Sequence, residues 1–302
     1  MALPRLISRT PSTTQRGLKQ SSGDSLSSSQ NPLLRDAPRN RHIFPGGFGN
    51  PEQAKNPPVE FTLPQLEDIL IKQHSPNDHV EHIYMKSAQY CKEYDKPQRE
   101  FILITVETAE DPRFSNFLVL DRTSSASDRT DQAGIVSMVS SSVSPSKPRD
   151  RIRISYDGSL KPLINYCGFS KYTVLETLEF QSASFRLYEM VALARAASES
   201  HRGYSTISNS CQWYTSLVWD CTRQLVPTAT HTQNNERSFR GRFNNLFRQR
   251  IDFMELSTVS GSVGAELNAL RQEFVSLQQS QSQNMILFQE QQRDELLQMG
   301  KE

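Results

Sequence analysis

The stretch "REFILITVETAEDPRFSNFLVLDRT" (residues 99–123) decides the fold class of this chain. It contains two runs rich in β-branched and aromatic residues, Arg99 to Glu107 and Phe114 to Thr123. Between them lies "TAEDPR", whose Asp-Pro pair is typical of a turn. The stretch therefore predicts a β-hairpin, and the segments on either side of it show what the hairpin packs against.

Helical and strand-like patterns alternate around this hairpin. Apolar residues at helical spacing predict helices at 61–73, 77–94, 158–169 and 184–201. Alternating apolar residues predict further strands at 150–157 and 171–180. The fold class expected is α+β: a small antiparallel sheet with packed helices, in one core that spans about residues 59–232.

Two segments lack the composition of a folded core. Residues 1–58 are rich in Ser, Pro and Arg, and residues 124–149 are rich in Ser, so neither buries enough apolar surface to offset the entropy of ordering. We expect a disordered tail and a disordered insertion. The basic residues of the tail resemble a mitochondrial transit peptide, but Pro4 and Pro11 would interrupt its amphipathic helix.

Composition excludes several classes of function. The chain has 34 Lys and Arg against 33 Asp and Glu, a net charge of +1, which disfavours a nucleic-acid-binding role. Its four cysteines form no CxxC pair and no Cys/His cluster, so we expect free thiols, no metal and no cofactor. No apolar run reaches the roughly 20 residues of a membrane span. The expected location is intracellular and most simply cytoplasmic, with mitochondria and nucleus left open.

The clearest chemical signal is "YSTISNSCQWYTSLVWDC" (residues 204–221). Ser208, Asn209 and Ser210 are good N-cap residues, and no Pro or Gly follows before residue 226, so a helix should begin near Cys211. Helical spacing places Cys221 on the apolar face and Cys211 at its edge. A helix N-terminus stabilises a thiolate, so Cys211 is a candidate nucleophile; the alternative is a small buried apolar residue.

The hydrophobic strands, the helix and the Asn-Ser-Cys-Gln-Trp-Tyr run together resemble the circularly permuted papain-like fold of lecithin:retinol acyltransferase-like and NlpC-type proteins. The strand with "LDRT" and the Cys-Gln-Trp run also resemble those of proteins from mushroom-forming fungi. The resemblance covers about residues 95–226. It implies a permuted papain-like core, with Cys211 as nucleophile and a histidine at the start of an early strand as its base.

The chain departs from that pattern at the base. The first long strand begins with Gln98, Arg99 and Glu100 where a histidine is expected, and Ser210 replaces the usual asparagine before the cysteine. The six histidines are His42, His74, His79, His82, His201 and His231. None of them opens that strand: we place His42 in the tail, His79 and His82 on a surface helix, His201 at a helix end and His231 in a polar linker.

The carboxyl-terminal part, residues 233–302, has two features. Residues 237–253 set Phe239, Phe243 and Phe247 four apart among arginines; they could dock on the core, fit a helical partner or lie on an anionic membrane surface. Residues 260–299 then predict a coiled-coil helix for self-association or a helical partner. Its heptad positions are Val263, Leu267, Leu270, Phe274, Leu277, Gln281, Asn284, Phe288 and Gln291. The alternative is one helix folded back on the core.

Two functions remain open from the sequence. The first is an interaction or scaffold protein, built on an inactive papain-like core and self-associating through its coiled coil. The second is a cysteine-dependent hydrolase or acyltransferase, in which Cys211 attacks an amide or ester and helix-start amides stabilise the oxyanion. Whether the chain is an enzyme stays undecided at this point.

Overall fold

A computed structural model gives the fold of the chain. It describes residue 44 and residues 57–72, 80–95, 98–109, 115–124, 148–169, 171–181, 184–200, 211–234, 240–243, 247–248 and 251–299. Most of the predicted tail and insertion lies outside these residues. Phe44 is an exception: it is fully buried in the main apolar cluster, so ordered packing includes a residue upstream of position 59.

The described residues form an α+β fold around a seven-stranded sheet in the order β1-β5-β4-β3-β2-β6-β7. Every neighbouring pair of strands is antiparallel. The strands are β1 (Val59–Thr62), β2 (Ile83–Glu93), β3 (Glu100–Thr108), β4 (Ser115–Ser124), β5 (Pro148–Ile154), β6 (Tyr172–Glu179) and β7 (Thr230–Gln233). The sheet is thus larger than the small one predicted.

The predicted hairpin is confirmed at the centre of this sheet. Strands β3 and β4 pair from Ile102↔Leu120 to Glu107↔Ser115, and alternate residues point to opposite faces. The predicted strands at 150–157 and 171–180 are also confirmed, as β5 and β6. Both faces of β3 are buried, because helices cover the sheet on each side.

The prediction of a helix over residues 77–94 is wrong. Residues Ile83–Glu93 form β2, a central strand between β3 and β6. The register shifts between Met85 and Ser87, so Ile83, Met85, Ala88 and Tyr90 share one apolar cluster although their spacing is not strictly two. A β-bulge inserts an extra residue and so turns a strand pattern into one that resembles a helix.

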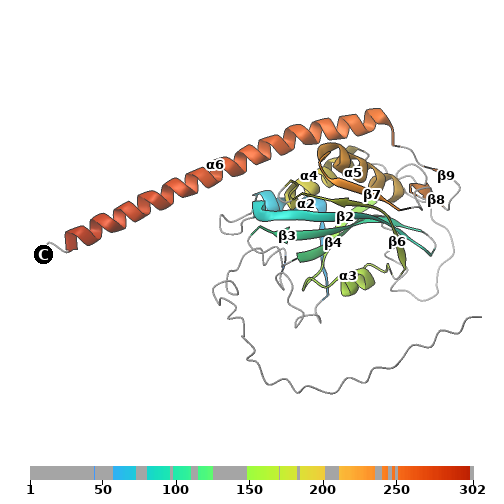
Figure 1. The fold of residues 1–302 in the computed structure, drawn as a ribbon, viewed down its shortest axis with the longest axis horizontal. Coiled ribbons are helices and arrows are strands. Elements are labelled where there is room, and N and C mark those ends of the chain that lie inside the picture. Colours follow the sequence, from blue (N-terminus) through green and yellow to red (C-terminus); the bar gives the residue numbers. More distant parts are fainter. Residues whose placement is uncertain are drawn as a thin grey trace, which may run out of the picture. The chain divides into compact units, whose positions relative to one another are not determined.

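Helices lie on both faces of the sheet (Figure 1). On one face, α4 (Leu187–Ser200) and α5 (Cys211–Leu225) pack on the main apolar cluster, and the predicted helices there are confirmed. On the other face, α3 (Leu160–Tyr166) covers a smaller cluster that includes Phe101 and Phe169, stacked with ring centroids 4.0 Å apart. Gly168 follows the C-terminal end of α3 with φ +72°, a left-handed conformation that suits glycine.

The predicted helix at 61–73 is shorter than expected. Residues Val59–Thr62 form β1, and Thr62 then caps α2 (Leu63–Glu67) through a capping box with Gln65. A π-helical turn, Asp68–Lys72, follows. A similar short turn, Val80–His82, precedes β2, so His82 does not lie on the predicted surface helix; His79 lies outside the described residues.

The carboxyl-terminal part contains a small hairpin and a long helix. Arg242–Phe243 (β8) pairs with Phe247–Arg248 (β9), so the aromatic residues do not form a helical stripe there. Helix α6 (Phe253–Met299) then packs its first half on α4 and α5 (Figure 1). Val259, Val263, Leu267 and Phe274 are buried in the main cluster, as expected for a helix folded back on its own core.

Candidate functional site

Cys211 is the first residue of α5, where the sequence places it. The predicted cap, Ser208 to Ser210, and His201 lie outside the described residues. The first turn of α5 rests on the beginning of β3. The side chain of Gln212 donates to the carbonyl of Gln98 at 3.4 Å, and the hydroxyl of Thr215 donates to the carbonyl of Glu100 at 3.1 Å.

The residues that replace the expected histidine point to different places. Arg99 lies on the α3 side, where its Nε is 2.7 Å from Glu93 Oε2 and its guanidinium lies 4.6 Å from the Phe169 ring centroid. Gln98 has φ +57°, a left-handed conformation. Glu100 is fully buried on the opposite side of β3. The structure therefore brings the backbone of Glu100, but not the side chain of Arg99, to the start of α5.

Cys211 is partly buried, and its surroundings raise the pKa of its thiol. Burial raises the pKa of Cys211 to about 12, and a hydrogen bond with the Glu100 backbone offsets this only in part. The other influences on this pKa are the charges of Glu100 and Asp121, which raise it, and of Arg99, which lowers it. A pKa so far above neutral leaves little thiolate near neutral pH. Because the thiolate is the reactive form of cysteine, we expect Cys211 to react slowly.

This state of the thiol predicts slow alkylation of Cys211. In the folded protein near neutral pH, we expect iodoacetamide to modify Cys211 at least about tenfold more slowly than after unfolding in urea. Mass spectrometry of the peptides measures the rate for all four cysteines. Cys221, which is buried in the core as predicted, serves as the matched internal control. A Cys211 rate that exceeds the others and levels off near neutral pH would contradict this expectation.

Glu100 belongs to a buried polar cluster that sequence reasoning missed. Its carboxylate accepts hydrogen bonds from Tyr90 Oη and from the backbone N–H of Gly241 at 3.2 Å, and it lies 3.1 Å from Lys92 Nζ. Tyr90 Oη is also 2.9 Å from Ser216 Oγ. Burial raises the pKa of Glu100, while Lys92 and Tyr90 lower it. This carboxylate is therefore engaged in structural contacts.

The cluster continues to a second buried carboxylate. Glu176 on β6 accepts from Trp219 Nε1 at 2.9 Å and lies 2.8 Å from His231 Nε2. Arg240 Nη1 is 3.1 Å from the other oxygen of Glu176. His231 lies on the edge strand β7, so its prediction as part of a polar linker is wrong. Arg240 contacts the core, whereas the docking alternative for residues 237–253 has the phenylalanines on the core and the arginines in solvent, so the solvated position expected for Arg240 is wrong. The docking of the phenylalanines and the membrane alternative stay predictions.

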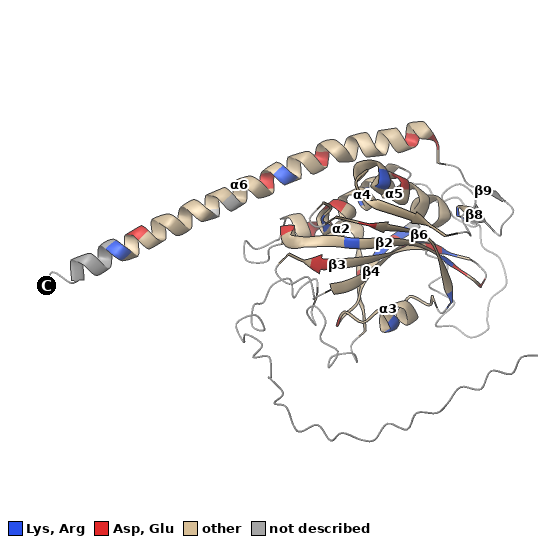
Figure 2. Ribbon diagram, viewed as in Figure 1, with Lys and Arg blue, Asp and Glu red and all other residues tan. Residues whose placement is uncertain are grey.

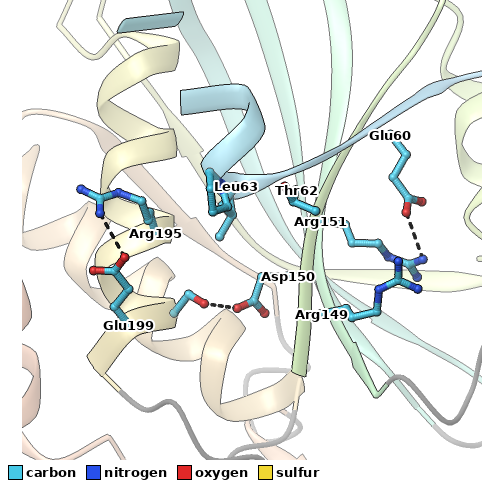
Figure 3. Close-up of a pocket in the computed structure, with 10 residues that line it drawn as sticks. Glu60, Thr62, Leu63, Arg149, Asp150, Arg151, Arg195 and Glu199 are labelled. Carbon is cyan, nitrogen blue, oxygen red and sulfur yellow. Dashed lines mark hydrogen bonds and ion pairs between the residues drawn. The ribbon is translucent and has the colours of Figure 1, made fainter. Parts of the chain in front are cut away.

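A pocket of about 240 Å³ lies elsewhere, between β5 and α4 (Figure 3). Its charged lining consists of Glu60, Arg149, Asp150, Arg151, Arg195 and Glu199. Figure 3 shows the ion pairs Arg195–Glu199 and Arg151–Glu60, at 3.0 and 3.4 Å, and the hydroxyl of Ser198 bonded to Asp150. Arginines and carboxylates neutralise one another here, and Cys211 is not part of the lining.

The second half of α6 carries apolar side chains at its surface. Met285, Ile286, Leu287 and Phe288 are 55–62% exposed. No residue between Glu273 and Glu290 is charged. Figure 2 shows few charges along this part of α6. Leu277, at a predicted heptad position, is also exposed, whereas Val263, Leu267 and Phe274 are buried against the chain's own core.

Comparison with known proteins adds no assignment. The chain matches no protein-family model, no curated protein and no solved structure. Among the described residues, no three or more His, Cys, Asp and Glu side chains come together as a metal site. None of the helices in the described part of the chain has the length and apolar character needed to cross a bilayer.

Proposed function

We propose that this protein is a non-catalytic interaction protein that self-associates through the part of α6 that follows Phe274. Its core is an inactive relative of the permuted papain-like proteins. The observation that carries the proposal is the run Met285–Phe288, four consecutive apolar residues exposed on a helix whose first half is already packed.

Exposure of this run is costly for an isolated chain. Burying one large apolar side chain contributes about 1.5–3 kcal/mol, so four exposed together favour a partner surface. The partner we propose is a second copy of this chain, because the heptad spacing continues through Leu277, Asn284 and Phe288 without a charge on the seam. The polar Gln281, Asn284 and Gln291 would limit which registers and oligomer numbers are stable.

The likeness to papain-like proteins rests on the start of α5. Cys211 begins a helix whose first turn lies on the start of β3, which is the placement that the resemblance implies. The proposal includes no general base for Cys211. Gln98, Arg99 and Glu100 stand where the histidine is expected. Glu100 is bound by Tyr90 and Lys92, and the Cys211 thiol beside its backbone has a raised pKa. These contacts support an inactive core over a cysteine hydrolase or acyltransferase.

Association through α6 is tested by placing charge in the exposed run. We expect the double variant Ile286→Glu/Phe288→Glu to weaken self-association at least tenfold, because two apolar contacts are lost and each 1.4 kcal/mol is a factor of ten. Light scattering after size-exclusion chromatography measures the mass.

The matched control for this experiment is Gln283→Glu/Gln289→Glu, a change at two exposed positions on the same helix that adds the same two negative charges. We expect this control to retain most of the association, since it removes no apolar side chain. If the double variant keeps the oligomer, α6 does not carry the interface. A loss of helical circular dichroism larger than the second half of α6 accounts for would mean that the double variant unfolds part of the core.

A further inference from the structure

Arg240 and Gly241 lie in the core in the way a bound peptide lies in its receptor. The guanidinium of Arg240 contacts Glu176 Oε1 at 3.1 Å, Asp220 Oδ1 at 2.7 Å and the carbonyl of Ser216 at 3.3 Å. It also lies 5.0 Å from the ring centroid of Tyr90. The N–H of Gly241 donates to the Glu100 carboxylate at 3.2 Å. We call these five contacting residues the Arg240 site.

The two buried carboxylates of the Arg240 site are positioned by the core alone. Trp219 and His231 hold one oxygen of Glu176, which leaves the other oxygen for Arg240. Lys92 and Tyr90 hold Glu100 independently of Gly241. The acceptors therefore keep their places through contacts with β2, β6, α5 and β7. Such preorganisation is typical of a binding site.

The geometry selects arginine followed by glycine. A planar guanidinium presents several donors at once and stacks on an aromatic ring, whereas an ammonium provides a compact charge without a planar face. The acceptors on Glu176, Asp220 and Ser216 suit the several donors of a guanidinium. The next residue has φ +65°, a left-handed conformation that glycine adopts without strain. Both residues of the dipeptide are thus recognised by separate features.

We propose that the Arg240 site is an arginine–glycine recognition site, occupied within this chain by Arg240–Gly241 and able to bind the same dipeptide from another polypeptide. The ligand class is an Arg–Gly peptide segment in which glycine adopts a left-handed conformation. The internal segment is then a tethered competitor of such a ligand. The inference does not depend on association through α6, because none of the contacts that define the site involves that helix.

The test removes the side chain of the internal arginine, while Gly241 stays in the chain, and supplies the peptide. The full-length Arg240→Ala protein is titrated with acetyl-Arg-Gly-amide at millimolar concentrations, with acetyl-Lys-Gly-amide as the matched control. Binding is followed by tryptophan fluorescence, since Trp219 contacts Glu176, and by the midpoint of thermal unfolding. We expect a saturable response and a raised midpoint with Arg–Gly, and a response at least tenfold weaker with Lys–Gly. The wild-type protein should not respond, because its own Arg240 fills the site.

A second variant keeps the test informative if Arg240→Ala does not fold. Arg240→Gln removes the charge but retains a hydrogen-bond donor on a shorter side chain, and it is titrated in the same way. A folded variant that shows no response to Arg–Gly would overturn the inference. Equal responses to Arg–Gly and Lys–Gly would overturn it as well, since the site would then bind any cation.

Discussion

Replacing Arg122 with methionine is expected to lower the free energy of unfolding by about 3–5 kcal/mol. Arg122 is buried on β4, where its Nε and Nη2 contact the two carboxylate oxygens of Asp150 at 2.6 and 2.7 Å. Its guanidinium also lies 4.4 Å from the Tyr214 ring centroid. The substitution would leave the buried Asp150 without its cation and would remove one contact between the sheet and the first turn of α5.

Urea unfolding followed by circular dichroism measures this loss. Arg223, at 40% side-chain exposure and 3.8 Å from Asp220, gives a matched control: Arg223→Met should change stability by less than about 1 kcal/mol. The double variant Arg122→Met/Asp150→Leu should recover part of the loss, because it removes the uncompensated charge. A single variant as stable as the wild type would show that the ion pair does not hold α5 in place.

Replacing Arg240 with alanine is expected to cost about 3–5 kcal/mol near neutral pH and less in mild acid. Burial alone would raise the pKa of Glu176, but Arg240 and the hydrogen bonds from His231 and Trp219 lower it below its ordinary value. A lowered pKa contributes stability above the unfolded value of about 4.3, and this contribution is lost as the pH falls through the folded value.

Removing Arg240 takes away the first of the groups that lower this pKa, while the burial that raises it remains. The ionised Glu176 then destabilises the variant at neutral pH, and protonation relieves that cost as the pH falls. The stability gap between wild type and Arg240→Ala should therefore narrow between about pH 7 and pH 4. Chemical unfolding at both pH values measures it; a gap that stays constant would mean that Glu176 does not sense Arg240.

The sequence predicted the parts of the fold that follow a simple period. Strands β3, β4 and β5 alternate cleanly, and the start of α5 at Cys211 was predicted from polar residues that precede a run without Gly or Pro. Strand β2 was missed because the bulge between Met85 and Ser87 breaks its alternation. Strand β7 was missed because four mostly polar residues carry no apolar pattern.

The candidate site was predicted less well than the fold. The first turn of α5, which Cys211 begins, lies on the beginning of β3, yet the contacts of Glu100 with Tyr90 and Gly241 join residues 10 and 141 positions apart. No local pattern marks such pairs. The buried Lys92 and Arg240 read as solvated charges in the sequence, since lysine and arginine are rarely buried unless paired. Their partners become visible through the sheet topology.

The heptad pattern of α6 combines two roles that the sequence could not separate. Its first half satisfies the pattern within the chain: Val263 and Leu267 pack on the core, and Arg271 Nε lies 2.5 Å from Glu189 on α4. Its second half keeps the spacing but leaves Leu277 and Phe288 exposed. Spacing shows which residues share a helix face, and it does not show which partner covers that face.

The mass of the full-length protein in solution tests the proposed function most directly. Sedimentation equilibrium over a range of protein concentrations measures this mass without any substitution. The account predicts a mass that rises with concentration to a whole-number multiple of the 34.4 kDa chain. A mass that stays at 34.4 kDa at every concentration would contradict it.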